Sequence, residues 1–373
     1  MQGGGMEIIM KHLEHGPVVF LAGEHYDIVW TTSVQGAAWV KSGGREYYDT
    51  VTGILRTEDT VHKVTVPKEV LDAEGGYTIF FRQVFEKTSY RPKSEEKAES
   101  RGFDFRPVRK NAEVNIYVIG DAHGFYKEAI AEGGYFGDEL DMLVLNGDIA
   151  DNDIVAQLGG VLEIGFGVTH GNIPTVHVRG NHDVRGSAAT LLHRFTGTDK
   201  GRFYFDFSAG DIYGIALDCG EDKLDSHIEY GGLNVFDVYR RKQTEFLDSI
   251  IGKGDYRKHR RVIVFCHIPL VTERNEPMAD IYAEWVRRLN VIRPDVMICA
   301  HEHRTDFAAA GGNLFDRATL EFPVMTGSVL EAEWIDEVCC FRDIAGTAVS
   351  VGNERILMRV TDFEKKVREE YTI

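Results

Sequence analysis

The sequence lacks the features of a disulfide-stabilised or membrane-spanning protein. It has five cysteines in 373 residues, an odd number, and no C-x-x-C pair of the kind that binds zinc. The Gly-rich start of the chain, residues 1–10, has an apolar stretch too short for a signal peptide or a membrane span. These absences predict a soluble, cytoplasmic protein without a disulfide framework.

Basic residues are also scarce relative to acidic ones. Forty-two Lys and Arg against 59 Asp and Glu give a formal net charge of −17. This excess of acidic residues argues against a protein that binds nucleic acid through a diffuse basic surface. It leaves room for an anionic substrate, because bound metal ions can dominate the local field of a site.

The first third of the chain is rich in short β-type runs. Gly-rich turns at 42–44 and 74–76 interrupt it, and the polar stretch 87–100 follows as a last loop or a linker. Such spacing without a helical period predicts a small β-sandwich domain over 1–106. The expected strands are 18–21, 26–30, 38–40, 62–66 and 77–81.

From residue 111 onward the pattern changes to apolar strands that alternate with amphipathic segments. This alternation predicts a second domain, 107–373, of mixed α/β class with layered sheets and helices. The expected helices are 125–132, 154–162, 188–195, 239–251 and 281–289.

Five apolar strands in this second part are followed at once by side chains that can bind metals. Ligands of open sheets bind beyond the carboxyl ends of the strands, so the five clusters should converge on one edge. One such cluster alone is weak evidence for metal binding, but the joint occurrence of all five predicts a metal site. The clusters are Gly120-Asp121-Ala122-His123, Gly147-Asp148 with Asp151, Gly180-Asn181-His182-Asp183, Cys266-His267 and His301-Glu302-His303.

This ordered pattern resembles the calcineurin-like metallophosphoesterase superfamily over about 111–307. The resemblance implies two β-sheets packed face to face, flanked by helices, with the metals at the strand ends. The β-rich segment before it is similar to the fibronectin-like N-terminal domain of purple acid phosphatases, a less specific likeness.

The resemblance also implies a ligand set for two metal ions, in which Asp148 bridges both. Mixed oxygen and imidazole ligands suit iron, manganese or zinc, and the sequence does not select among them. By this mapping one ion takes Asp121, His123, Asp148 and His303, and the other takes Asp148, Asn181, His267 and His301.

Three residues beside these ligands are expected to act on the substrate. By the logic of the family His182 points at the phosphoryl group and protonates or stabilises the leaving oxygen. Asp183 is expected to hold the imidazole of His182 and to favour its charged form. Arg185 is a candidate phosphate clamp, with a surface salt bridge as the alternative.

Two positions depart from the family pattern. Ala300 stands where many members have Gly before the paired histidines. Asp151 stands where purple acid phosphatases have an iron-ligating Tyr, so the resemblance implies a complete site without the phenolate that gives the purple colour.

These observations predict hydrolysis of a phosphate monoester by a hydroxide bound to a dinuclear metal centre. The alternatives are a phosphodiesterase with the same site and a binding module that has lost catalysis. The expected partner is a small phosphate ester or a phosphorylated substrate, with neither nucleic acid nor membrane. We expect specificity to depend on the loops 222–237 and 272–277, which carry no readable motif.

Overall fold

The computed structural model describes residues 10–151, 157–335 and 338–373. Among these residues, no helix is both long and apolar enough to span a membrane. Cys219, Cys266 and Cys299 are buried free thiols. The side chains of Cys339 and Cys340 lie outside the described part.

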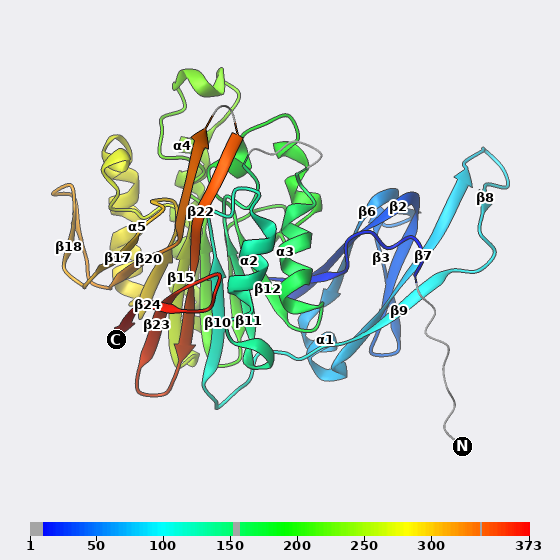
Figure 1. The fold of residues 1–373 in the computed structure, drawn as a ribbon, viewed down its shortest axis with the longest axis horizontal. Coiled ribbons are helices and arrows are strands. Elements are labelled where there is room, and N and C mark those ends of the chain that lie inside the picture. The colour runs from blue at the N-terminus through cyan, green and yellow to red at the C-terminus, as the bar shows by residue number, and fades with distance from the viewer. Residues whose placement is uncertain (1–9, 152–156, 336–337) are drawn as a thin grey trace.

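Two layers of β-structure form the larger body of the molecule (Figure 1). In the first sheet β10, β11 and β12 are parallel neighbours, and β22 joins β10 in the antiparallel sense. Buried alternate residues of these strands pack on the second sheet, and the other faces pack on α2 and α3. These elements are β10 (Val114–Ile119), β11 (Met142–Asn146), β12 (Pro174–Val178), β21 (Val329–Ile335), β22 (Val338–Val351), β23 (Ile356–Asp362), β24 (Val367–Thr372), α2 (Tyr126–Gly133) and α3 (Gly160–Thr169).

The second sheet has the order β13-β14-β15-β16-β20-β17, and its middle strands are parallel. Its outer face is covered by α4 and α5, whose apolar residues share one core cluster with it. These elements are β13 (Phe205–Ala209), β14 (Ile212–Leu217), β15 (Arg261–Cys266), β16 (Val296–Cys299), β17 (Thr305–Ala308), β20 (Val324–Gly327), α4 (Phe236–Lys253) and α5 (Ala279–Ile292), with the small hairpin β18 (Gly312–Leu314) and β19 (Ala318–Leu320). The four layers confirm the predicted mixed α/β class.

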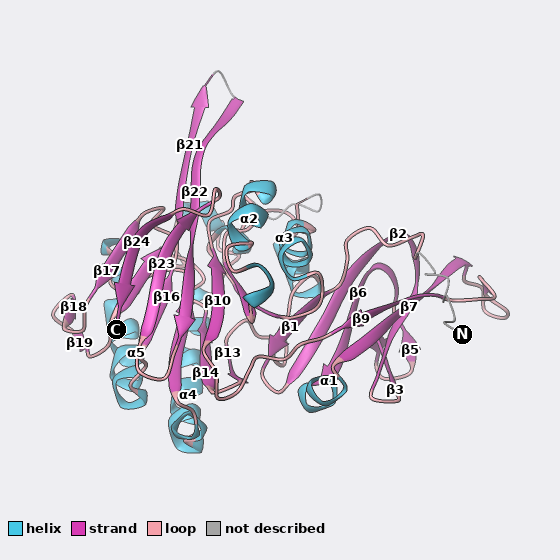
Figure 2. Ribbon diagram, turned by 60° about the horizontal axis from the view of Figure 1, so that its bottom comes forward, coloured by secondary structure: helices cyan, strands magenta, loops and turns pink. Residues whose placement is uncertain are grey.

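The β-rich N-terminal part lies to one side of this body (Figure 2). Its long strand β2 pairs with β1 and β6 in its first half and with β7 and β3 in its second, with an irregularity between Thr31 and Gly36. The elements are β1 (Val18–Ala22), β2 (His25–Ser42), β3 (Arg45–Tyr48), β4 (Thr50–Val51), β5 (Leu55–Arg56), β6 (Glu58–Pro67), α1 (Lys68–Glu74), β7 (Gly76–Glu86), β8 (Lys93–Ser94) and β9 (Glu99–Asp104).

The first strand of this N-terminal part also extends the first sheet of the larger body. β1 runs parallel to β12, with Val19 opposite Pro174 and Phe20 opposite Thr175. Backbone pairing therefore crosses the expected boundary at 106/107. The division into two domains and the fibronectin-like nature of the first stay predictions.

Several expected helices differ from the structure in extent or type. α4 and α5 cover the segments expected at 239–251 and 281–289, and α2 is shifted by one residue from the segment expected at 125–132. The segment 188–195 forms 3-10 turns, η3 (Ala189–Arg194), instead of an α-helix. The expected helix 154–162 falls partly outside the described residues, and α3 begins only at Gly160. The other 3-10 segments are η1 (Gly137–Glu139), η2 (His182–Val184), η4 (Ile228–Tyr230), η5 (Asp255–Lys258) and η6 (Glu273–Met278).

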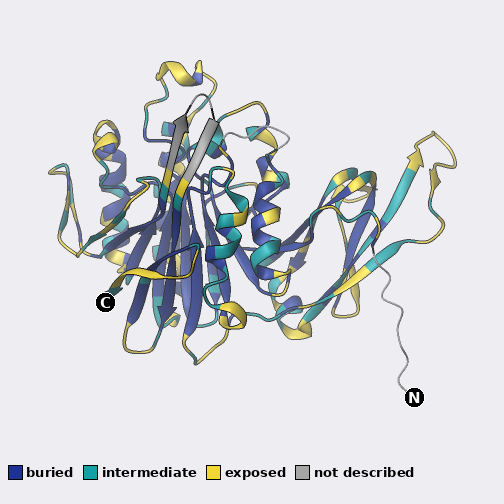
Figure 3. Cartoon of the chain, in the orientation of Figure 1, coloured by how far each residue is buried: buried dark blue, intermediate teal, exposed yellow. Residues whose placement is uncertain are grey.

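The core of the molecule lies between and behind the two sheets. Figure 3 shows that the central strands of both sheets are almost entirely buried, while exposed residues gather in the loops and in edge strands such as β24. β10, β11, β12 and β16 are buried at every position. A polar side chain that follows such a strand is therefore held at a rigid strand end, which suits a catalytic site.

Candidate metal centre

All seven candidate ligands lie just beyond the carboxyl ends of parallel strands. Three loops come from neighbouring strands of the first sheet and two from neighbouring strands of the second. Face-to-face packing of the sheets brings the loops to one edge. Asp121 and His123 follow β10, Asp148 follows β11, Asn181 follows β12, His267 follows β15, and His301 and His303 follow β16.

The first group of ligand atoms surrounds a buried carboxylate oxygen. Oδ1 of Asp121 accepts no hydrogen bond from the residues that the structure describes, although it is fully buried. It lies 3.4 Å from Nε2 of His303 and 3.8 Å from Nε2 of His123. These two nitrogens are themselves 3.3 Å apart. An unpartnered buried carboxylate facing imidazole nitrogens is an arrangement that a cation would complete.

The second group gathers around the side chain of Asn181. Its Oδ1 lies 2.9 Å from Nδ1 of His301 and 3.2 Å from Nε2 of His267. The opposite amide orientation would place the nitrogen against the same two rings and the oxygen 3.0 Å from Arg185. With the oxygen inward, three electron-pair donors converge, as metal binding requires.

Asp148 lies between the two groups. Its Oδ2 is 3.2 Å from Nε2 of His267 and 3.8 Å from Nε2 of His123. Burial alone would raise the pKa of Asp148, but the charge of His267 lowers it to about 2. Asp148 therefore offers one ionised oxygen to both groups, as a bridging carboxylate would.

The electrostatics of His267 point to a site built for positive charge. Burial would lower the pKa of His267, but Asp148 and Asp121 raise it to about 10. The two carboxylates thus strongly favour a cation at this point. A metal ion can supply that charge in place of the proton.

The backbone at the site is held in an uncommon conformation. Five candidate ligands have left-handed φ angles: 53° at Asp121, 41° at His123, 54° at Asp148, 73° at His301 and 51° at His303. For a non-Gly residue this region costs roughly 1–2 kcal/mol. Such outliers cluster at functional sites, where the surrounding fold enforces them.

Three of the imidazoles have their second nitrogen occupied by an oxygen. Nδ1 of His267 donates to the carbonyl of Asn146 at 2.7 Å, and Nε2 of His301 lies 3.2 Å from Oδ2 of Asp222. Nδ1 of His123 lies 3.5 Å from a carboxylate oxygen of Asp151. These contacts fix the tautomers so that the other nitrogen of each ring is free for a metal.

The structure brings His182 to the site but gives Asp183 a different partner from the one expected. Nδ1 of His182 donates to the carbonyl of Asp151, and its Nε2 is 4.0 Å from Oδ2 of Asp148. The carboxylate of Asp183 accepts the backbone N–H groups of Gly180, at 2.7 Å, and Asp148, at 3.3 Å. The expectation that it holds the ring of His182 is therefore corrected.

The local turn and the burial of Asp183 explain this difference. The 3-10 turn η2 directs the side chain of Asp183 back under its own loop. Burial and the charge of Asp148 raise the pKa of Asp183 to about 6.

Residues outside the motifs complete the site. Oγ of Ser328 donates to Oδ2 of Asp121 at 2.6 Å, and Asp222 contacts His301 as described above. Sequence reasoning missed both, because neither lies in a recognisable pattern. The strand-end position of Ser328, just after β20, was the available signal.

A cavity of about 380 Å³ opens above the ligands. The expected clamp Arg185 lines it, with Nη2 held by Glu221 at 2.6 Å and Nη1 3.4 Å from Nε2 of His182. Every residue that lines it is polar or charged, so it suits a polar, ionic ligand. They are Asp148, Asn181, His182, Arg185, Lys223, Arg274, His301, Glu302 and His303.

Comparison with known proteins identifies the family. Residues 114–305 match the model of the calcineurin-like phosphoesterase family. The match spans slightly more than half of the chain, so the chain belongs to this family. No curated protein sequence matches it.

Two solved structures share the fold over nearly the whole chain. A purple acid phosphatase, PPD1, from yellow lupin seeds superimposes with a TM-score of 0.60 at 11% identity, covering 96% of this chain and 73% of that one. PhoD superimposes with a TM-score of 0.56 at 9% identity, covering 96% of this chain and 88% of that one. At these identities the likeness concerns the fold alone, and it includes the N-terminal β-rich part.

The family establishes the general activity. The chain is a metal-dependent hydrolase that acts on phosphate ester bonds. The predicted cofactor, two transition-metal ions, agrees with the family and with the three groups of ligand side chains, which are Asp121-His123-His303, His123-Asp148-His182 and Asp148-His267-His301. The mixture of carboxylate, amide and imidazole donors suits iron, manganese or zinc alike.

Proposed function

We propose that this chain hydrolyses phosphate monoesters at a dinuclear metal site. In this proposal Asp148 would hold both ions, and His182 and Arg185 would act on the phosphoryl group. The remaining ligands are Asp121, His123 and His303 for one ion and Asn181, His267 and His301 for the other.

The charge of the cavity wall carries the preference for a monoester. Arg185, Lys223 and Arg274 line the same cavity as the candidate ligands. A phosphate monoester carries about two negative charges at neutral pH, whereas a diester carries about one. The acids that pair with these cations, Glu221 and Asp222, are buried, so the accessible side of the wall is positive and binds the more highly charged ester more strongly.

The metal pair, when bound, would supply an activated water and neutralise charge on the phosphoryl oxygens. The side chains then divide the other tasks. Since Nδ1 of His182 donates to Asp151, Nε2 is the nitrogen that can hold or release a proton at the leaving oxygen. Glu221 holds Nη2 of Arg185, and Nη1 lies 3.4 Å from Nε2 of His182, so Nη1 and Nε2 can contact the same phosphoryl group.

Asp183 takes a positioning role in this proposal. Its carboxylate fixes the amides of Gly180 and Asp148 and thereby the two loops that carry Asn181 and the bridging carboxylate. Its effect on the reaction is expected to pass through the geometry of these loops.

The test compares p-nitrophenyl phosphate with bis-p-nitrophenyl phosphate for protein loaded with iron, manganese or zinc. We expect a higher kcat/KM on the monoester and loss of activity after chelation with EDTA. A higher kcat/KM on the diester would replace the proposal by a phosphodiesterase. Inactivity on both esters with two metals bound would favour a binding module.

A further inference from the structure

Two adjacent buried acids organise a row of cations along one wall of the cavity. Oε2 of Glu221 accepts from Arg185 at 2.6 Å, and Oε1 lies 3.4 Å from Nζ of Lys223. Oδ1 of Asp222 accepts from Lys223 at 3.2 Å, and Oδ2 accepts from Arg274 at 3.1 Å. Acids and cations thus alternate from Arg185 to Arg274.

This row is tied to the candidate metal site at both ends. Arg185 contacts His182 at 3.4 Å. At the other end the same oxygen of Asp222 that binds Arg274 lies 3.2 Å from Nε2 of His301. A single carboxylate oxygen therefore separates the guanidinium of Arg274 from a candidate metal ligand.

The acids and the cations differ sharply in exposure. The side chains of Glu221 and Asp222 are 0% and 1% exposed, whereas those of Lys223 and Arg274 are 25% and 67% exposed. The negative members lie under the wall and the positive members face the cavity. An anion that enters meets the cations first.

Lys223 and Arg274 still have donors to offer. Arg274 has five N–H groups and directs one at Asp222, and Lys223 has three. Glu229 is a third acid near Lys223, at 3.6 Å, but it lies on the exposed turn η4, where solvent weakens the pair. A phosphate oxygen can therefore compete for the ammonium group.

In the proposed reaction His182 and Arg185 contact the scissile phosphate, whereas Lys223 and Arg274 add only to the positive field of the wall and keep donors for a second anionic group. A neighbouring cavity of about 480 Å³ shares the lining residues Arg274 and Glu302 with this one. That second cavity includes apolar residues, so it can take the organic part of a substrate. They are Val271, Ala308 and Val324.

We propose that Lys223 and Arg274 form a subsite for a second phosphate group carried by the leaving group of the substrate. This inference rests on the proposed phosphomonoesterase function. It assigns the substrate to compounds with two phosphates, joined either by an anhydride oxygen or by a short carbon linker. Hydrolysis removes one phosphate by water, and the other leaves with the rest of the molecule.

The kinetic experiment compares three substrates: propyl phosphate, propane-1,3-diol bisphosphate and inorganic pyrophosphate. We expect kcat/KM on propane-1,3-diol bisphosphate to exceed that on propyl phosphate by roughly tenfold or more, or kcat/KM on pyrophosphate, which has the better leaving group in any case, to fall roughly tenfold in the variant described below, since charge-assisted hydrogen bonds have that order of effect. Which of the two is preferred distinguishes the linker from the anhydride. Equal values on all three compounds would overturn the inference.

Variants of the two cations connect the preference to the subsite. The double variant Lys223→Met, Arg274→Gln leaves Glu221 paired with Arg185 and Asp222 with His301, so the fold should persist. It should reduce the preference roughly tenfold, mainly through KM. Arg287→Gln is the matched control, because Arg287 lies on α5, is 54% exposed and lines neither of the two cavities. A preference that survives in the double variant would contradict the subsite.

A binding measurement separates this inference from the proposed function. Calorimetry on metal-loaded protein compares methylenebisphosphonate with methylphosphonate, neither of which is hydrolysed. We expect the bisphosphonate to bind roughly tenfold more tightly, and the double variant to remove that difference. If the protein hydrolyses no monoester yet shows this difference, the proposed function fails and the subsite stands. Equal binding of the two compounds would overturn the subsite whatever the activity.

Discussion

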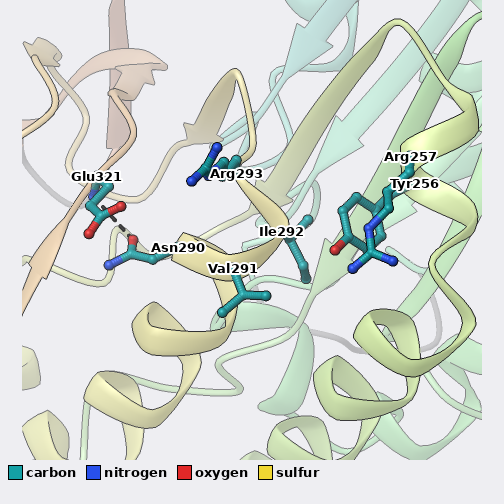
Figure 4. Close-up of a pocket in the computed structure, with 7 residues that line it drawn as sticks. All are labelled: Tyr256, Arg257, Asn290, Val291, Ile292, Arg293 and Glu321. Carbon is teal, nitrogen blue, oxygen red and sulfur yellow. Dashed lines mark hydrogen bonds between the residues drawn. The ribbon is translucent and has the colours of Figure 1, made fainter.

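Two cavities at opposite edges of the second sheet show how little volume says about function. The larger, about 540 Å³, lies where β15 and β16 begin, and Tyr256, Arg257, Asn290, Arg293 and Glu321 surround it with Val291 and Ile292 (Figure 4). The smaller, about 380 Å³, lies where the same strands end. Only the smaller one is lined by candidate metal ligands. Convergence of ionisable groups, and not size, distinguishes the site.

The backbone shows the same difference between the edges. At the carboxyl edge five candidate ligands are in the left-handed region, each two or four residues beyond the last residue of a strand. At the amino edge Arg293 is also left-handed, but it caps the end of α5 and its N–H bonds Leu289. A left-handed residue at a helix end is an ordinary stop, whereas five among ligands indicate an enforced geometry.

The largest expected effect comes from removing the bridging carboxylate. Asp148→Ala should abolish activity on every ester and release metal, because Asp148 contacts both ligand groups. Elemental analysis measures the loss of metal, and rates on alkyl and aryl phosphates measure the loss of activity. Asp255→Ala is the control and should retain both properties, because Asp255 lies in η5 at the amino edge with its side chain 44% exposed. Two metals bound to an inactive Asp148→Ala protein would argue against the bridge.

A smaller and selective effect is expected at His182. His182→Ala should slow hydrolysis of alkyl phosphates by roughly 10²–10⁴-fold, the usual contribution of a general acid. Aryl phosphates need less protonation and should lose less. Metal content should stay near that of the unchanged protein. Since Nε2 of His182 is 4.0 Å from Oδ2 of Asp148, loss of metal would instead identify His182 as a ligand.

A weaker effect is expected one contact away from the metals, at Asp222. Asp222→Ala removes the acceptor that fixes the ring of His301, so metal affinity should fall about 10–100-fold. The metal affinity of the Asp222→Asn variant should fall less, because the amide oxygen of the new side chain can still accept a hydrogen bond from His301. A titration with zinc or manganese in a competing chelator measures the change. Unchanged affinity in Asp222→Ala would remove this residue from the site.

The sequence predicts the layered class of the larger body and the edge where the chemistry lies, because both rest on local patterns. Buried runs such as 114–119 and 142–145 directly precede Asp121 and Asp148, and parallel strands place such ends together. The helix α1 was missed although Pro67 and the left-handed Gly75 flank it, which is a readable start and stop.

Other features depend on the tertiary fold and leave no local pattern. The hydrogen-bond partners of the Asp183 carboxylate depend on the tight turn η2, which the neighbouring residues in the sequence do not specify. Lys223 and Arg274 come from loops without periodicity, and only the packing of both sheets brings them to one cavity. The parallel pairing of β1 with β12 likewise joins segments more than 150 residues apart in the chain.

The smallest effect is expected at the larger cavity. Arg257→Ala removes an exposed guanidinium that lies 5.0 Å from the ring of Tyr256, a contact worth about 0.5–1 kcal/mol of folding stability at an exposed site. Because this cavity lies at the amino edge, kcat/KM on p-nitrophenyl phosphate and metal content should stay unchanged within error. Thermal unfolding, kinetics and elemental analysis measure these three quantities. A loss of activity larger than the loss of stability explains would show that the amino edge communicates with the metals, and the distinction between the two edges would fail.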